Sequence, residues 1–201
     1  MKGLWLALTL WGGMLAWADE IELIGSDTVA SLIEPFPAHP VPYLYRIGSD
    51  AVVFLVNRHN PLRALTLKEL EALLQPQARW PDGRPVVLYS MGANHATMHY
   101  VRQIFGAAGT PQSLHPQRTP ELVIANVVND EQGLGWLSLG RLRDEALSGA
   151  RPLSLEGEPP LLPDQRLNPA YPLHRDLYLG FSRQPNRAEQ ALVDYLIGQQ
   201  E

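Results

Sequence analysis

Short apolar runs of strand length alternate along the chain with segments whose apolar positions recur at helical spacing. Residues 51–56 are apolar at every position, as in a strand that is covered on both faces of a sheet. Further candidate strands are residues 86–89, 133–138 and 177–181. The alternation predicts an α/β fold, and the sequence contains no internal repeat.

Local capping signals mark where the helices are expected to begin. Thr66 and Glu69 have the spacing of a capping box, in which each residue satisfies a backbone N–H group of the other. Thr119 is a cap followed by Pro120 at the first helical position, and Asn186 caps the last helix. The helices that these signals predict cover residues 67–74, 120–128 and 187–197, with Gly198 as a stop after the last one.

A further helix is expected after the strand at residues 86–89. Its apolar positions are Met98, Val101, Ile104 and Phe105, which have the spacing of one helical stripe. We expect this stripe to face the core.

The chain begins with the features of a cleavable secretory signal peptide. Lys2 precedes an apolar core over residues 3–15, and small residues around Ala18 form a cleavage site. Residues 1–18 are therefore expected to be removed, which leaves Asp19 first and places the protein in the periplasm. An uncleaved anchor is the alternative, but the apolar run is shorter than the ~20 residues that span a bilayer.

Composition excludes several classes of function. Hydrophobic residues make up 45% of the chain and charged residues 18%, which is typical of a globular protein. The net charge is −5 and no cluster of Lys and Arg is present, so a nucleic-acid partner is not expected. The chain has no Cys, which excludes disulfides and lipid attachment to a cysteine.

A candidate anion site lies where the strand predicted at residues 21–24 meets a helix. Gly25 permits a tight turn, and Ser26, Asp27 or Thr28 can cap the helix that follows. A helix start presents unpaired N–H groups and the positive end of the helix dipole, where a phosphate-like oxyanion can bind. An ordinary capping turn is the alternative interpretation of the same residues.

Histidines offer a weaker candidate site. His95 and His99 are four positions apart, which places both rings on one face of the predicted helix, where they could share a metal. No third ligand accompanies them, so a solvated or core-edge pair is the preferred interpretation. No Gly-x-Ser-x-Gly turn, phosphate loop or Cys nucleophile is present, and neither catalysis nor a metal or other cofactor is expected.

Five motifs occur in the order found in the phosphate-binding proteins of bacterial phosphate ABC transporters. They are residues 24–28, residues 51–61 with 65–70, Thr97 with Phe105, residues 133–139 and residues 171–179. The chain resembles this PstS-like family as a shortened and divergent member. The resemblance implies a type II periplasmic binding protein-like fold, an α/β architecture of two lobes with the anion in the cleft between them.

The resemblance also implies domain boundaries. Residues 19–201 would form the binding-protein domain, with lobe 1 at about 21–57 and 172–201 and lobe 2 at about 58–171. The connection over residues 31–48 is much shorter than its counterpart in the family, which brings further anion ligands, including an acidic residue that accepts a hydrogen bond from protonated phosphate. Lobe 1 is therefore expected to be truncated and to lack those ligands.

A second departure from the family lies in residues 89–97, which resemble its second anion-binding loop. Met91 stands where the family has an Arg, His95 where it has a Ser and Ala96 where it has a Gly, while Thr97 is retained. A charge-assisted hydrogen bond to an anion contributes about 1.5–3 kcal/mol. Loss of the Arg therefore predicts weak binding.

The resemblance implies a periplasmic solute-binding protein of an ABC transporter that binds phosphate or a related small oxyanion. The expected ligand-binding residues are Ser26, Asp27, Thr28, Asn94, His95 and Thr97. The expected state is a monomer that works with an inner-membrane ABC permease or sensor. The alternative is a ligand-free interaction module that serves as an accessory to a membrane sensor or transporter. Arg175 is expected to form a structural ion pair with Asp176 or another acid.

Overall fold

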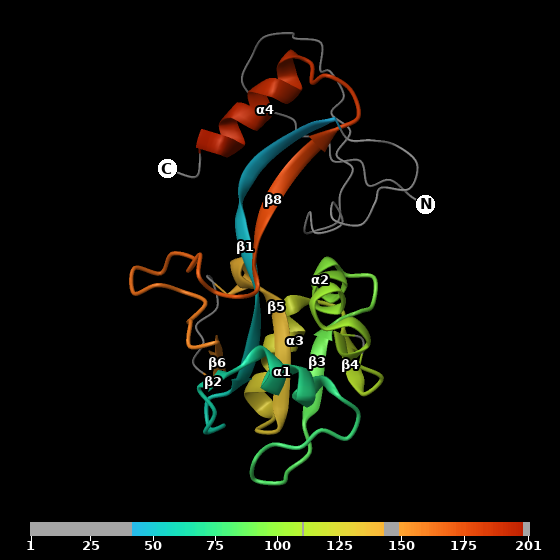
Figure 1. The fold of residues 1–201 in the computed structure, drawn as a ribbon, viewed down its shortest axis with the longest axis vertical. Helices are drawn as coiled ribbons and strands as arrows, with labels where there is room; N and C mark the ends of the chain where they lie inside the picture. The colour runs from blue at the N-terminus through green and yellow to red at the C-terminus, as the bar shows by residue number, and fades with distance from the viewer. Residues whose placement is uncertain (1–41, 110, 143–148, 199–201) are drawn as a thin grey trace. The chain divides into compact units, whose positions relative to one another are not determined.

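The computed structural model describes residues 42–109, 111–142 and 149–198, which divide into two compact units. Unit 2 is Ser49–Asp176, and the described part of unit 1 is residues 42–48 and 177–198. The strands β1 (Tyr43–Asn57) and β8 (His174–Phe181) each contribute residues to both units (Figure 1).

Unit 2 begins at Ser49 and ends at Asp176, whereas the predicted lobe boundaries lie near residues 57 and 172. The reason is that residues 52–57 of β1 pair with strands of unit 2. The lobes that would close on a ligand stay a prediction. Residues 1–18 and the candidate site at residues 21–28 lie outside the described residues.

Unit 2 is built on a mixed sheet with the strand order β4-β3-β5-β1-β6, in which β8 also pairs with β1. The remaining strands of this sheet are β3 (Val87–Met91), β4 (Leu114–Gln117), β5 (Gly133–Ser138) and β6 (Ala150–Pro152). β3 runs parallel to β4 and β5, whereas β1 runs antiparallel to β5 and β6. β2 (Ala64–Leu65) and β7 (Ser154–Leu155) form a separate short parallel pair.

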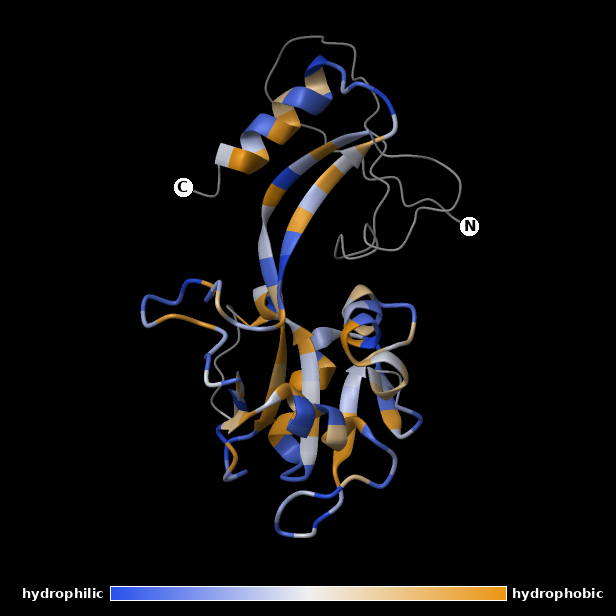
Figure 2. Cartoon of the chain, viewed as in Figure 1, coloured by the Kyte–Doolittle hydropathy of each residue, from blue (hydrophilic) through white to orange (hydrophobic). Residues whose placement is uncertain are grey.

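The apolar stretch at residues 51–56 lies at the centre of the core, as predicted. All six side chains are fully buried, and the stretch is a continuous apolar segment of β1 in Figure 2. Phe54 pairs in register with Trp136 of β5, and the two rings stack with their centroids 5.4 Å apart. Burial of this stretch removes a continuous apolar surface from water and contributes to the hydrophobic stabilisation of unit 2.

The helix α3 (Pro120–Asn129) packs directly on the backbone of β5. A Cβ atom at Gly135 would meet Val127 Cγ2 at 2.6 Å and Val123 Cγ1 at 3.1 Å. Only glycine leaves room for so close an approach of helix to strand.

The predicted helix starts are confirmed. α1 (Leu67–Leu74) begins with a complete capping box, in which Glu69 N donates to Thr66 Oγ1 at 3.1 Å and Thr66 N donates to Glu69 Oε2 at 2.7 Å. α3 begins at Pro120 after its Thr119 cap. The described part of unit 2 also contains α2 (Ala96–Phe105) and the 3₁₀ turns η2 (Gly106–Gly109) and η3 (Leu139–Arg141).

The predicted apolar stripe of α2 is correct at three of its four positions. Met98, Val101 and Phe105 are buried, but the side chain of Ile104 is 44% exposed. Ile104 lies in the last turn of α2, next to the buried Phe105. None of the helices in the described ranges has the length and apolar character needed to cross a membrane.

In unit 1, α4 (Arg187–Gly198) is fixed at its start by Glu189, whose side chain is almost fully buried. Its carboxylate accepts bonds from Asn186 N at 2.7 Å and from two nitrogens of Arg183 at 2.7 and 2.8 Å. Asn186 Oδ1 in turn accepts from Glu189 N at 2.9 Å, which confirms Asn186 as the predicted cap. Hydrogen bonds from Arg183 are the largest cause of a lowered pKa at Glu189.

Replacing Glu189 with Ala should destabilise the protein by about 1–2 kcal/mol at pH 7, most of it from loss of the acceptor for Asn186 N, because solvent screens the largely exposed Arg183. Since the folded pKa lies below the ordinary value of 4.5, the carboxylate contributes fully above that pH, and its contribution is lost as the pH falls through the folded pKa. Urea unfolding at several pH values measures this difference. The exposed Asp194→Asn on the same helix is the control, and an equal loss in both variants would contradict the assigned role of Glu189.

Candidate functional site

The parallel strands β3 and β5 end at the same edge of the unit 2 sheet. β3 ends at Met91 and β5 at Ser138, and the turn after β3 leads directly into α2. In open α/β sheets, ligands bind beyond the carboxyl ends of the strands, where helix N-termini and loops gather. This carboxyl edge is the candidate site.

The start of α2 brings together the three described residues of the predicted ligand set. Asn94 is exposed in the turn, His95 is the N-cap and is half-buried, and Thr97 is fully buried in the first turn. His95 Nδ1 accepts from Thr97 N at 3.4 Å and lies 2.9 Å from Thr97 Oγ1. The His95 ring thus occupies the place at which an anion would meet the helix start, and it also engages the Thr97 hydroxyl.

A buried ion pair lies at the same edge and connects three strands. Arg175 Nη2 of β8 donates to Asp50 Oδ2 of β1 at 2.7 Å, and both side chains are less than a tenth exposed. Ser138 Oγ at the end of β5 lies within 3.0 Å of both Asp50 oxygens, and Gly140 N donates to Asp50 Oδ1 at 3.4 Å. The predicted ion pair of Arg175 with an acid is confirmed, with Asp50 as the partner. Asp176 instead accepts from Ser49 Oγ at 3.1 Å.

The Arg175 guanidinium lies against α2. Its central carbon is 5.3 Å from the centroid of the Tyr100 ring, a cation–π contact, and Tyr100 Oη donates to the backbone oxygen of His174 at 2.9 Å. Burial raises the pKa of Tyr100, while the nearby Arg175 charge acts in the opposite direction. Among the described residues, nothing accepts a hydrogen bond from Arg175 Nε or Nη1, although both atoms are buried.

A family model described as the PBP superfamily domain matches residues 41–200. The chain belongs to the PBP superfamily. Among curated protein sequences, none is significantly similar to it.

Solved structures with the same fold support this assignment. A protein from Clostridium perfringens, assigned as a phosphate ABC transporter substrate-binding protein and solved with bound phosphate, is 16% identical with a TM-score of 0.62. An ABC-type phosphate transport receptor from Vibrio cholerae is 14% identical with a TM-score of 0.63. The regulatory domain of Synechocystis CcmR, in complex with 2-PG, is 16% identical with a TM-score of 0.57. The aligned regions cover 77%, 80% and 84% of this chain, respectively.

The PBP-like α/β fold predicted from the sequence is therefore confirmed. At these identities, the similarity establishes the fold and not the ligand. The chain spans 65% of the length of the Clostridium protein and 68% of the Vibrio protein, in line with the expected shortening relative to the phosphate-binding family.

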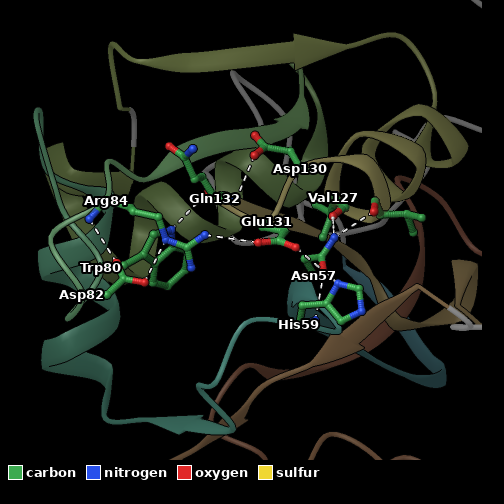
Figure 3. Close-up of polar contacts among 10 residues, drawn as sticks. Asn57, His59, Trp80, Asp82, Arg84, Val127, Asp130, Glu131 and Gln132 are labelled. Atoms are coloured by element: carbon green, nitrogen blue, oxygen red, sulfur yellow. Dashed lines mark hydrogen bonds and ion pairs between the residues drawn. The ribbon is translucent and has the colours of Figure 1, made fainter.

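At the C-terminal end of β1, a second polar group of this PBP domain holds loops together (Figure 3). Asn57 Nδ2 donates to the carbonyl oxygens of Val127 and Val128 at 3.1 and 2.8 Å, which caps the end of α3. Trp80 Nε1 donates to the carbonyl oxygen of Gln132 at 2.9 Å. These bonds fix the end of α3 to β1, and the segment before β3 to the start of β5.

An exposed row of ionisable side chains crosses the same region. Glu131 lies 3.4 Å from His59 Nδ1 and 3.3 Å from Arg84 Nη1, and Arg84 Nε lies 2.8 Å from Asp82 (Figure 3). All four side chains are more than a third exposed, so each pair contributes little to stability. The described residues include no group of three or more His, Cys, Asp or Glu that could hold a metal, and His99 contacts Arg102.

The sequence did not single out Asp50, Ser138 or Tyr100. Asp50 does carry a signal, because it is a charged residue directly before the apolar run at residues 51–56. A lone acid in such a position requires a partner when it is buried. The sequence does not reveal which cation approaches it.

Replacing Asp50 with Ala should destabilise the protein by roughly 3–5 kcal/mol, because Arg175 is then left as an uncompensated buried charge. The double variant Asp50→Ala with Arg175→Met should be less destabilised than Asp50→Ala alone, since no unpaired charge remains. Urea unfolding of the single and double variants measures both effects. Strictly additive losses would show that the two side chains do not stabilise each other.

Proposed function

We propose that this PBP-superfamily protein is a periplasmic solute-binding protein that binds phosphate or a related oxyanion with low affinity. The observation that carries the proposal is the start of α2 at the carboxyl edge of β3 and β5, where Asn94, His95 and Thr97 lie within one helical turn. The proposed ligand set from the sequence is Ser26, Asp27, Thr28, Asn94, His95 and Thr97.

The electrostatics of this edge favour a small anion. A helix N-terminus carries partial positive charge and offers backbone N–H donors. An oxyanion at this position would compete with His95 Nδ1 for the Thr97 N–H group. A charged oxygen is a better acceptor than a neutral ring nitrogen, so the anion would replace His95 Nδ1 at the Thr97 N–H group, and the ring would donate to the anion from its other nitrogen. Displacing the His95 cap costs free energy, which reduces the net free energy of anion binding and agrees with low affinity.

The cellular setting of the proposal comes from the first residues and from the family. The signal-like segment at residues 1–18 would export the protein to the periplasm, where a bound anion could be passed to an inner-membrane ABC permease or reported to a sensor. The fold similarity to phosphate-transport proteins of Clostridium and Vibrio supports this setting. Closure of two lobes on the ligand, as a monomer, belongs to the same proposal.

A second candidate is a ligand-free interaction module that acts as an accessory to a membrane sensor or transporter. The observation that favours it is the His95 cap, which satisfies the helix start without a ligand. The apolar Met91, which is 8% exposed at the end of β3, adds no charge there. The two candidates differ in whether an oxyanion stabilises the fold.

Thermal unfolding in the presence of phosphate, sulfate, selenate and molybdate should separate these candidates. An anion present at a hundred times its Kd stabilises the folded state by ~2.7 kcal/mol, which raises Tm by roughly 5–10 °C for a domain of this size. Chloride at matched ionic strength is the control for general salt effects. If no oxyanion raises Tm more than chloride does, the binding function is wrong and the interaction module is favoured.

Replacing Met91 with Arg should strengthen anion binding by roughly ten- to a hundredfold, because it restores a charge-assisted donor beside the start of α2. Isothermal titration with phosphate measures the change. Met91→Gln is the matched control, since it adds a polar side chain of similar length without charge. An equal affinity in the Arg and Gln variants would show that residue 91 does not face the anion.

A further inference from the structure

We infer that the Arg175 guanidinium is the positive charge that holds the bound oxyanion. The apolar Met91 cannot fill this role. The inference rests on the proposed function. A guanidinium carries five N–H donors, two on each terminal nitrogen and one on Nε. In the described part of the chain, Asp50 is bonded to Nη2, which leaves the three donors on Nε and Nη1 without an acceptor.

Unpartnered donors of this kind are unusual on a buried charged group. The Arg175 side chain is 3% exposed, so water does not satisfy these donors from the surface. Buried N–H groups are nearly always hydrogen-bonded, and an orphaned donor indicates a missing water, ion or ligand. A tetrahedral oxyanion would provide the acceptors that the described residues do not.

Arg151 shows how the same protein treats an arginine with a purely structural role. Its Nη1 and Nη2 atoms donate to the carbonyl oxygens of Arg58, Asn60 and Leu62 at 2.6–3.0 Å. Only its Nε lacks a partner. Both terminal nitrogens of Arg151 are bonded, whereas Nη1 of Arg175 is not, and this contrast favours a further acceptor at Arg175.

The position of Arg175 joins it to the candidate site at α2. The guanidinium lies over the ring of Tyr100, and Thr97 precedes Tyr100 by three positions. Residues three apart share one side of a helix, so Thr97 lies one turn closer to the start of α2 on the side that Arg175 contacts. The positive charge and the helix start therefore converge on the same edge of unit 2.

Asp50 limits the strength of this site. Its carboxylate is neutralised by Arg175 and by the bonds from Ser138 and Gly140, but it still reduces the field that an anion meets. Because Nε and Nη1 are buried, the side chains around them must shift to admit a ligand, and part of the binding free energy is spent on that shift. Both effects favour a small oxyanion that binds weakly.

Nuclear magnetic resonance of the arginine Nε–H groups tests this assignment in the unaltered protein. Addition of inorganic phosphate should shift the Nε–H signal of Arg175 and leave in place that of Arg151, the control, whose Nε is also buried without a partner. Arg175→Lys identifies the signal, and through-bond correlation to the Arg175 backbone identifies it if that variant does not fold.

The outcomes separate the inference from the function on which it rests. If phosphate stabilises the protein against heat but the Arg175 signal does not move, the inference is overturned and the proposed function stands. If phosphate neither stabilises the protein nor moves any signal, both are wrong.

Affinity measurements give a second test. Arg175→Gln should weaken phosphate binding by roughly ten- to a hundredfold, as expected for the loss of a charge-assisted donor. Arg151→Gln should change the affinity by less than about twofold. Equal losses in the two variants would mean that Arg175 acts on binding only through the fold.

Discussion

The buried ion pair between Asp50 and Arg175 is the constraint on which the carboxyl edge of unit 2 depends. The two residues are 125 positions apart, so the pair fixes where β8 returns to β1. Removing two charges from water is costly, and the pair is tolerated only when further hydrogen bonds surround it. Ser138 and Gly140 supply those bonds to Asp50 and thereby tie the end of β5 to the same point.

The proposed anion site would take its positive charge from this ion pair. The end of β3 carries Met91, and His95 caps α2 in the absence of a ligand. Positive charge is nevertheless present at the same edge, because Arg175 is held there by Asp50 and Tyr100. A site built in this way relies on a structural residue for its charge, which makes weak binding the expected result.

Local features of the fold could be predicted from the sequence, whereas the site depends on contacts that the sequence does not display. The capping box at Thr66 and the proline at Pro120 act within one helical turn, so short motifs specify them. The pairing of Asp50 with Arg175 depends on strand register across most of the chain. The burial of Thr97 could not be predicted either, because its hydroxyl is engaged by a capping side chain rather than directed outward.

A crystal structure grown in selenate would test the central claim most directly, because selenium can be located by its anomalous scattering. The account predicts a selenate ion at the carboxyl edge of unit 2, with oxygens within hydrogen-bonding distance of Arg175 and of the start of α2. A structure in which ordered water or a side chain satisfies Arg175 Nε and Nη1, with no anion at this edge, would contradict it.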